Sequence, residues 1–275
     1  MLLGKPYFPR PEENRYDDDG DVVAARRIFY EKPSKNLLFL LRHRFAWMQD
    51  YISPTSSVGV EVGCGIGVTG EFVKAKSLKM TDYGENPWLD MAHVDAMNTP
   101  FSDGELDFVL CSNMIHHLPS PVKFLREMHR IIKPGGYLLV QEVNCSFFMR
   151  LVLHLMRKEG YSYDVNVFDE NAILSDPTNP WAANAAIPNL LFDNPDRFHR
   201  EIPLFLSSSL PLFRIERDRY SEFLLFFNSG GVTAKTPYIP LPNWALRCVK
   251  SIDSFLIMLS KNTFALQRSI VLKKN

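Results

Sequence analysis

The sequence predicts an α/β fold built around a parallel sheet, and three observations point to it. Short apolar runs alternate with helical segments between residues 58 and 145. These runs are apolar along their whole length, which is typical of parallel strands covered by helices on both faces. A length of 275 residues with a hydrophobic fraction of 46% suits one large α/β domain and argues against disorder.

The expected elements of the first half follow from periodicity and turn residues. Residues 1–21 read as an irregular arm, and helices are expected over Val22–Phe29 and Ser34–Tyr51, before Ser53-Pro54. The expected strands are Val58–Val62, Leu78–Thr81, Phe108–Cys111 and Tyr137–Val143. The expected helices between them are Thr69–Lys76 and Pro121–Ile132, with a turn at Pro134-Gly135-Gly136.

The second half has a looser rhythm. After Cys145 we expect a helical stretch to about Leu210, a strand within Phe213–Leu225, a helix over Asn243–Leu259 and a final strand over Ala265–Leu272. Ser146–Lys158 predicts an amphipathic helix that either packs on the core or lies on a membrane surface.

Charge and cysteine content exclude some classes of function. The 31 basic and 31 acidic residues give a net charge of zero, which supplies no global field to attract nucleic acid. The 4 cysteines form no CxxC pair, and no His, Asp or Glu cluster has metal-ligand spacing, so we expect neither disulfides nor a metal. Neither a signal peptide nor a transmembrane helix is predicted, and a reducing, cytoplasmic location is expected.

A glycine-rich loop, Gly63-Cys64-Gly65-Ile66-Gly67, directly follows the strand Val58–Val62. Glycines at alternate positions let the backbone turn sharply and let a ligand approach without a Cβ in the way. A helix start after the loop offers free N–H groups. We therefore expect a small-molecule site at the carboxyl end of the first strand.

Two ligand classes compete for this loop. Gly65–Gly70 fits the GxGxxG pattern of a dinucleotide site, which would make the protein an NAD(P)-dependent oxidoreductase. However, the first glycine after the strand is Gly63, and Glu61 places a carboxylate at the strand end. That carboxylate repels a pyrophosphate and suits a cationic ammonium group.

These residues resemble the class I S-adenosylmethionine-dependent methyltransferases of the type 11 kind. In that family an E/D-x-G-x-G-x-G loop cradles the methionine part of the cofactor, and here it reads Glu61-Val62-Gly63-Cys64-Gly65-Ile66-Gly67. Further signatures follow in the family's order: Asp82, Asp95-Ala96-Met97, the run Phe101–Phe108, Ile115-His116-His117-Leu118, and Leu125–Gly136 with its KPGG turn.

The resemblance implies S-adenosyl-L-methionine as the cofactor. It implies that Asp82 accepts both ribose hydroxyls, that Tyr83 lies against the adenine and that Asp95 receives the adenine amino group. The cofactor-binding residues expected from it are Glu61, Gly63, Cys64, Gly65, Gly67, Asp82, Tyr83, Asp95, Ala96, Met97 and Asn113.

The resemblance also implies the architecture. It predicts a Rossmann-like, doubly wound sheet of seven mostly parallel strands with the last strand antiparallel. One domain would span residues 1–275. Its parts would be an arm and helical cap (1–51), a cofactor-binding core (58–145), a helical insertion or lid (146–212), and the last strands and helix (213–275).

Within the family, the resemblance is to bacterial members linked to surface-polysaccharide or lipid-linked sugar pathways. It is carried by Thr81–Asp90 (TDYGENPWLD) and Pro180–Phe192 (PWAANAAIPNLLF). It departs at Glu142-Val143 and Glu159-Gly160, where relatives often carry Glu-Pro. The resemblance implies a small-molecule, glycan or lipid-linked acceptor, with no nucleic acid partner and with peripheral membrane contact left open.

Methyl transfer to oxygen requires a base in addition to in-line positioning of the sulfonium methyl. His116, His117 and Glu142 are the candidates, because all three follow or end strands at the expected acceptor edge. His154 and Glu159 are further candidates, and Trp181, Asn184 and Asn189 are candidates for lining the acceptor pocket. Two alternatives stay open, namely the oxidoreductase and a non-catalytic, cofactor-binding accessory protein.

Overall fold

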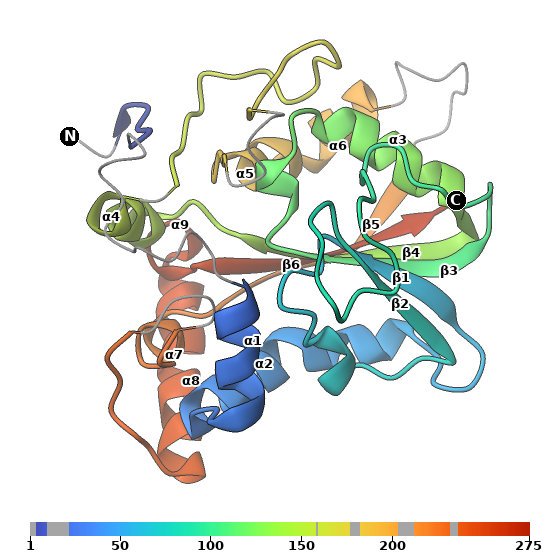
Figure 1. Cartoon of the computed structure of the whole chain (residues 1–275). Coiled ribbons are helices and arrows are strands. Elements are labelled where there is room, and N and C mark those ends of the chain that lie inside the picture. Colours follow the sequence, from blue (N-terminus) through green and yellow to red (C-terminus); the bar gives the residue numbers. More distant parts are fainter. Residues whose placement is uncertain (1–3, 10–21, 158, 177–181, 203–211, 232–235) are drawn as a thin grey trace.

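The computed structural model describes residues 4–9, 22–157, 159–176, 182–202, 212–231 and 236–275. Within them, a six-stranded sheet of order β2-β1-β3-β4-β6-β5 forms the centre of the molecule (Figure 1). The strands are β1 (Val58–Val62), β2 (Ser77–Thr81), β3 (Leu106–Ser112), β4 (Ile132–Val143), β5 (Phe213–Ser221) and β6 (Gln267–Lys274). Strands β1 to β4 pair in parallel, and β6 is antiparallel to both of its neighbours. The expected antiparallel last strand is therefore confirmed.

Helices cover both faces of the sheet (Figure 1). One apolar cluster packs α3 (Pro121–Ile131), α5 (Ile187–Phe192) and α6 (Pro195–Glu201) against the sheet. A second cluster packs α1 (Val22–Glu31) and α2 (Lys35–Phe45) on the other face. The remaining α-helices in the described residues are α4 (Phe147–Met156), α7 (Leu224–Phe227), α8 (Asn243–Leu259) and α9 (Lys261–Phe264). The doubly wound arrangement was expected from strands that are apolar throughout.

Seven strands were expected, and the described residues contain six. On the free edge of β2, Met91 makes a single parallel bridge with Thr81. The neighbouring backbone groups of Met80 are already taken by Asp90, whose Oδ2 accepts from the Met80 amide at 2.7 Å and whose amide donates to the Met80 carbonyl at 2.9 Å. Because a side chain occupies the position of a ladder hydrogen bond, the pairing ends after one bridge.

The helix predicted over Thr69–Lys76 is wrong, since only Thr69–Glu71 forms a 3-10 turn. Gly70 lies at its centre and lowers helix propensity. Further on, the Gln49 side chain satisfies the backbone of Lys74, accepting from its amide at 2.8 Å and donating to its carbonyl at 2.9 Å. These two bonds replace the helical hydrogen bonds that the segment would otherwise need.

The turn predicted at Pro134-Gly135-Gly136 lies inside an irregular part of β4. Pairing with β3 jumps there from Leu106–Ile132 to Phe108–Tyr137. Gly135 has φ +79°, so the extra residues form a glycine-dependent bulge between two paired stretches. The helix predicted over Ser146–Lys158 corresponds to α4, and Lys158 itself lies outside the described residues.

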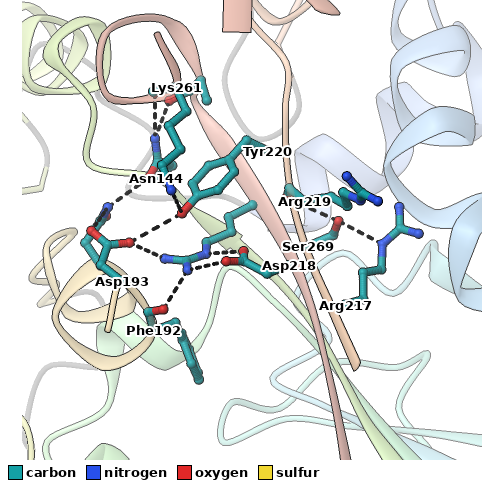
Figure 2. Close-up of polar contacts among 12 residues, drawn as sticks. Asn144, Phe192, Asp193, Arg217, Asp218, Arg219, Tyr220, Lys261 and Ser269 are labelled. Carbon is teal, nitrogen blue, oxygen red and sulfur yellow. Dashed lines mark hydrogen bonds and ion pairs between the residues drawn. The ribbon is translucent and has the colours of Figure 1, made fainter. Parts of the chain in front are cut away.

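A buried arginine fastens the antiparallel end of the sheet to the end of α5. The Arg268 side chain on β6 is 1% exposed and pairs with Asp218 on β5 at 2.7 Å and with Asp193 after α5. It also donates to the Phe192 carbonyl at 2.8 Å, and its guanidinium lies 4.9 Å from the Tyr220 ring centroid. Figure 2 shows these partners converging from the two strands and the helix end. This network ties the C-terminal end of α5 to β5 and β6.

Candidate functional site

The glycine loop adopts the left-handed conformation at each of its three glycines. Gly63, Gly65 and Gly67 have φ of +64°, +51° and +62°. A Cβ on Gly63 would lie 2.4 Å from the Met114 side chain, whereas a Cβ on Gly65 would meet no protein atom within 4 Å. The loop therefore requires glycine for its backbone. At Gly65 it also faces space that the described protein does not fill.

Hydrogen bonds tie the loop to the end of β2. The Gly65 amide donates to Asp82 Oδ2 at 2.8 Å, and the Gly84 amide donates to Asp82 Oδ1 at 3.0 Å. The Cys64 amide donates to the Thr81 carbonyl at 3.1 Å. Each carboxylate oxygen of Asp82 thus accepts one backbone bond and keeps acceptor capacity for a ligand.

Glu61 is a buried carboxylate directly behind the loop. Its side chain accepts a hydrogen bond from Thr69 Oγ1 at 2.6 Å through Oε1, while Oε2 is buried and has no partner among the described residues. Burial raises the pKa of the Glu61 carboxyl to about 7, with the Thr69 hydrogen bond opposing this rise and the Asp82 charge adding to it. A cation placed against Oε2 would remove this penalty.

Asn113 supplies a second buried acceptor at the end of the neighbouring strand β3. It lies in the left-handed region at φ +49°, and its amide donates to the Gln141 carbonyl at 2.7 Å. Its Oδ1 is buried without a hydrogen-bond partner in the described part of the chain. Since β1 and β3 are adjacent and parallel, Glu61 and Asn113 lie near the same edge of the sheet.

The other predicted cofactor residues lie in sequence beside Asp82 or just after Val94, whose amide donates to the Asp82 carbonyl at 3.0 Å. Asp95 is half-buried and accepts from the Met97 amide at 2.8 Å, and Ala96 is buried between them. Tyr83 is 58% exposed, so most of its side chain faces solvent. The Cys64 thiol is buried, and this burial raises its pKa above the usual range, which makes it a packing residue rather than a nucleophile.

Sequence reasoning missed two side chains that contact the loop. Arg26 on α1 donates to the carbonyls of Ile66 at 2.6 Å and Gly67 at 2.8 Å. Trp88 donates from Nε1 to the Gly65 carbonyl at 3.1 Å, and the Arg26 guanidinium lies 4.8 Å from its ring centroid. Arg26 is 40 positions before Ile66 in the chain, so no local pattern indicates this contact.

Among the candidates for the base, the structure brings His116 and Glu142 together. Glu142 is fully buried, and its Oε2 accepts from His116 Nδ1 at 2.6 Å. Its Oε1 accepts from the amides of Met114 at 2.7 Å and Ile115 at 2.6 Å. Burial by itself lowers the pKa of His116, but the charges and hydrogen bonds of Glu142 and Glu159 outweigh burial and raise this pKa to about 10.

His117 lies beside His116, with ring centroids 4.3 Å apart. Its Nδ1 donates to the Ala182 carbonyl at 3.2 Å. Burial, helped by the positive charge of His116, lowers the pKa of His117 to about 4. Glu159, which follows α4, completes the group, since its Oε2 lies 3.7 Å from His116 Nε2. His154 instead contacts the Tyr161 hydroxyl at 3.2 Å.

The two asparagines expected to line an acceptor pocket instead use their side chains to hydrogen-bond other segments of the chain. The Asn184 side chain hydrogen-bonds the backbone of Ser162 at 2.9 and 3.1 Å. The backbone amide of Asn184 donates to the His116 carbonyl at 2.9 Å. Asn189 accepts from the Cys145 amide and donates to Asn144. Both side chains are buried and satisfied by protein, while Trp181 lies outside the described residues.

Comparison with known proteins agrees with this geometry. Residues 60–140 match the family model described as "Methyltransferase domain". This segment is therefore similar to methyltransferase domains. It carries the glycine loop, Asp82, Asp95 and the two histidines.

Similar proteins in the curated set cover only part of the chain. A ubiquinone biosynthesis O-methyltransferase of Pseudomonas paraeruginosa is 26% identical over 141 residues, which are 45% of this chain and 60% of the relative. A demethylmenaquinone methyltransferase of Staphylococcus saprophyticus is 31% identical over 101 residues, 34% of this chain and 43% of the relative. The chain therefore spans 60% or less of these relatives. A SAM-dependent methyltransferase structure from Archaeoglobus fulgidus has 16% identity and a TM-score of 0.49, covering 86% of this chain and 93% of that one.

The side chains around the glycine loop have the chemistry to hold a sulfonium amino-acid cofactor. Oε2 of Glu61 and Oδ1 of Asn113 are buried hydrogen-bond acceptors that have no donor among the described residues. An ammonium group can donate to both of them. Asp82 retains acceptor capacity on both oxygens for vicinal hydroxyls. The space at Gly65 leaves room for a ligand to lie against the backbone.

Proposed function

We propose that this chain is a methyltransferase that moves a methyl group from S-adenosyl-L-methionine to an oxygen atom of a small-molecule acceptor. The observation that carries the proposal is the buried carboxylate oxygen Oε2 of Glu61, which has no hydrogen-bond partner among the described residues. It lies behind a left-handed glycine loop that Asp82 anchors. A fixed anion at this place favours a cationic ligand, and a phosphate would be repelled by it.

In this proposal Glu61 and Asn113 hold the ammonium of the methionine moiety, and Asp82 accepts from the ribose hydroxyls. Asp95 receives the adenine amino group, with Ala96 and Met97 beside it and Tyr83 closing over the ring. Arg26 holds the loop in shape through the Ile66 and Gly67 carbonyls. The bound cofactor supplies an activated methyl group, and the chain supplies orientation and exclusion of water.

The structure gives a reason to prefer this cofactor over a dinucleotide. Binding a pyrophosphate relies on the N–H groups and dipole of a helix that starts at the glycine loop. Here the loop leads into the 3-10 turn Thr69–Glu71, which is too short to carry a helix dipole of useful size. The oxidoreductase alternative based on Gly65–Gly70 is therefore disfavoured.

We place the acceptor at the edge lined by His116, His117 and Glu159, and we propose that this group promotes loss of the acceptor's proton. Glu142 is proposed to position His116 rather than to react, because its two oxygens already accept from His116 and from two backbone amides. One relative named above is an O-methyltransferase of ubiquinone biosynthesis and another is a demethylmenaquinone methyltransferase, and these names support a phenolic or quinol acceptor. Glycan and lipid-linked acceptors present the same kind of hydroxyl oxygen.

We further propose that α8 brings the protein to an anionic membrane surface, where a lipid-linked acceptor is found. One face of α8 is apolar yet exposed, through Trp244, Ile252, Phe255, Met258 and Leu259. Arg247 and Lys250 flank it, while Asp253 is buried and accepts from the amides of residues 223–225. Exposed apolar side chains beside basic ones suit a lipid interface. Along the described chain, no helix is long and apolar enough to cross a membrane.

Methyl transfer is tested by incubating the full chain with methyl-labelled S-adenosylmethionine and a panel of catechols, hydroquinones and glycolipids. The proposal expects label on an acceptor oxygen, with loss of transfer in Glu61→Ala. Tight cofactor binding without transfer to any acceptor would favour the accessory protein instead. Sedimentation with phosphatidylserine vesicles tests the membrane contact, which Phe255→Asp should abolish without changing cofactor affinity.

A further inference from the structure

Two histidines and one carboxylate converge at the acceptor edge, although no spacing in the sequence indicates a metal site. One ligand atom from each of His116, His117 and Glu159 lies within 4.8 Å of the other two. His116 Nε2 and Glu159 Oε2 are 3.7 Å apart. Ligands about 2.1 Å from a tetrahedral metal ion lie about 3.4 Å from each other. Small side-chain rotations thus bring these atoms to coordination distance.

Both imidazoles are oriented as metal ligands usually are. Metal-binding histidines donate their second ring N–H to a carboxylate or a backbone carbonyl, which fixes the tautomer and the ring plane. His116 Nδ1 donates to Glu142 Oε2 at 2.6 Å, and His117 Nδ1 donates to the Ala182 carbonyl at 3.2 Å. These bonds assign Nε2 as the ligand atom of each ring.

The carboxylate behind His116 is itself rigid. Glu142 is buried and accepts from the backbone amides of Met114 and Ile115. A group held by two amides and a histidine keeps the imidazole in one orientation. The arrangement is a carboxylate–histidine pair of the kind that raises the basicity of a ligating nitrogen.

We propose that His116, His117 and Glu159 bind one divalent transition-metal cation of the zinc class. Two imidazole nitrogens and one carboxylate suit Zn²⁺ or a similar d-block ion better than Mg²⁺ or Ca²⁺, which prefer sites made of oxygen. The cation also balances the charges of Glu142 and Glu159, whose side chains are 0% and 23% exposed. A proton competes with the metal cation for His116 Nε2. When protonated, this nitrogen donates a hydrogen bond toward Glu159 and cannot act as a metal ligand.

Three protein ligands leave a fourth coordination position open. In the proposed methyl transfer, on which this one consequence rests, the open position would take the acceptor hydroxyl and lower its pKa. Cation binding itself requires neither the methyl donor nor the acceptor. The two proposals can therefore fail separately.

The test is calorimetric titration of Zn²⁺ into the full chain after removal of metal with EDTA, with no methyl donor or acceptor present. All proteins carry Cys248→Ser, because this exposed thiol could bind zinc. We expect one Zn²⁺ per chain, no heat with Mg²⁺, and the visible absorption of a four-coordinate ion when Co²⁺ is the probe. Absence of a saturable zinc site, or equal binding of Mg²⁺, overturns the proposal.

Variants then locate the site. Glu159→Gln and His117→Ala should each weaken zinc binding at least tenfold, and Glu142→Gln should weaken it about 10- to 100-fold through the second shell. His93→Gln is the matched control, since its side chain is 72% exposed and lies outside the cluster. Thermal unfolding and S-adenosylmethionine binding show which variants fold. Folded variants that bind zinc as tightly as the control overturn the proposal, and His117→Ala decides the question if the glutamate variants fail to fold.

Discussion

The amide of Gly65 donates a hydrogen bond to Asp82 Oδ2 at 2.8 Å, across 17 positions of the chain. This bond ties the loop after β1 to the end of β2, so one carboxylate shapes the loop and offers acceptors to a ligand. Asp82→Ala should weaken S-adenosylmethionine binding at least tenfold, because hydrogen bonds from a ligand to a charged group contribute about 1.5–3 kcal/mol each. Calorimetry measures the change.

Asp90→Asn is the control for this prediction. Asp90 also follows β2 and also accepts a backbone amide, from Met80, but it is exposed and not among the proposed cofactor residues. Its substitution should leave cofactor affinity within about twofold. Equal losses in both variants would mean that Asp82 acts only by holding the backbone.

Glu61 should make both stability and cofactor affinity depend on pH. Its pKa is about 7 in the folded chain and 4.5 without the fold, so the folded state prefers the protonated carboxyl. The contribution of Glu61 to the free energy of unfolding should therefore be largest below pH 4.5. It falls as pH rises through 7, by up to about 3 kcal/mol. Cofactor affinity should change in the opposite direction, because the cation binds the ionised form.

Glu61→Gln isolates this effect. The variant should unfold at a higher temperature than the parent at pH 8, since no buried charge forms, and should bind S-adenosylmethionine weakly at every pH. Thermal unfolding at pH 5.5 and 8 and calorimetry over the same range provide both readouts. A parent whose affinity is flat across this range would contradict the assignment of Glu61 to the cation.

Alanine substitutions at two glycines, Gly65 and Gly104, should distinguish the effect of backbone strain from the effect of lost ligand contact. Gly65 and Gly104 both have positive φ, of +51° and +58°, and a Cβ on either would meet no atom of the described residues within 4 Å. Alanine at either position should cost about 1–2 kcal/mol of stability, measured by urea unfolding. Only Gly65→Ala should also lose cofactor affinity, because its Cβ enters the space assigned to the ligand. Similar affinity in the two variants would argue that this space is not the cofactor site.

Arg268 should be a stability residue with no direct part in binding. Arg268→Ala removes a buried side chain and its hydrogen bonds to Asp193 and Asp218, which are 46% and 31% exposed, and this should cost about 1.5–3 kcal/mol (Figure 2). Arg214→Ala, on an arginine whose side chain is 62% exposed, should cost less than about 1 kcal/mol. Urea unfolding of both variants checks the contrast.

Periodicity predicted elements whose pattern is local. The strand Val58–Val62 and the helix Asn243–Leu259 have the predicted bounds, because each pattern is set by the residues within it. The helix predicted after the glycine loop is wrong, because the side chain of Gln49, which lies outside that segment, hydrogen-bonds the backbone of Lys74. No window of sequence contains that interaction.

The candidate site divides in the same way. Parallel strands bring their carboxyl ends to one edge, so the proximity of Glu61, Asp82 and His116 could be expected from strand order. The contact of Arg26 with the loop depends on how α1 packs, and the meeting of Glu159 with His116 depends on the path of the chain after α4. Both are tertiary contacts between distant segments, which spacing alone does not reveal.

The central claim is that the glycine loop and its carboxylates bind S-adenosylmethionine. Calorimetric titration of the full chain with S-adenosylmethionine, S-adenosylhomocysteine and NADH tests it most directly. We expect saturable binding of the first two ligands with one site per chain, and no heat from NADH. Folded protein that binds NADH, or that binds neither methionine-derived ligand at millimolar concentration, would contradict it.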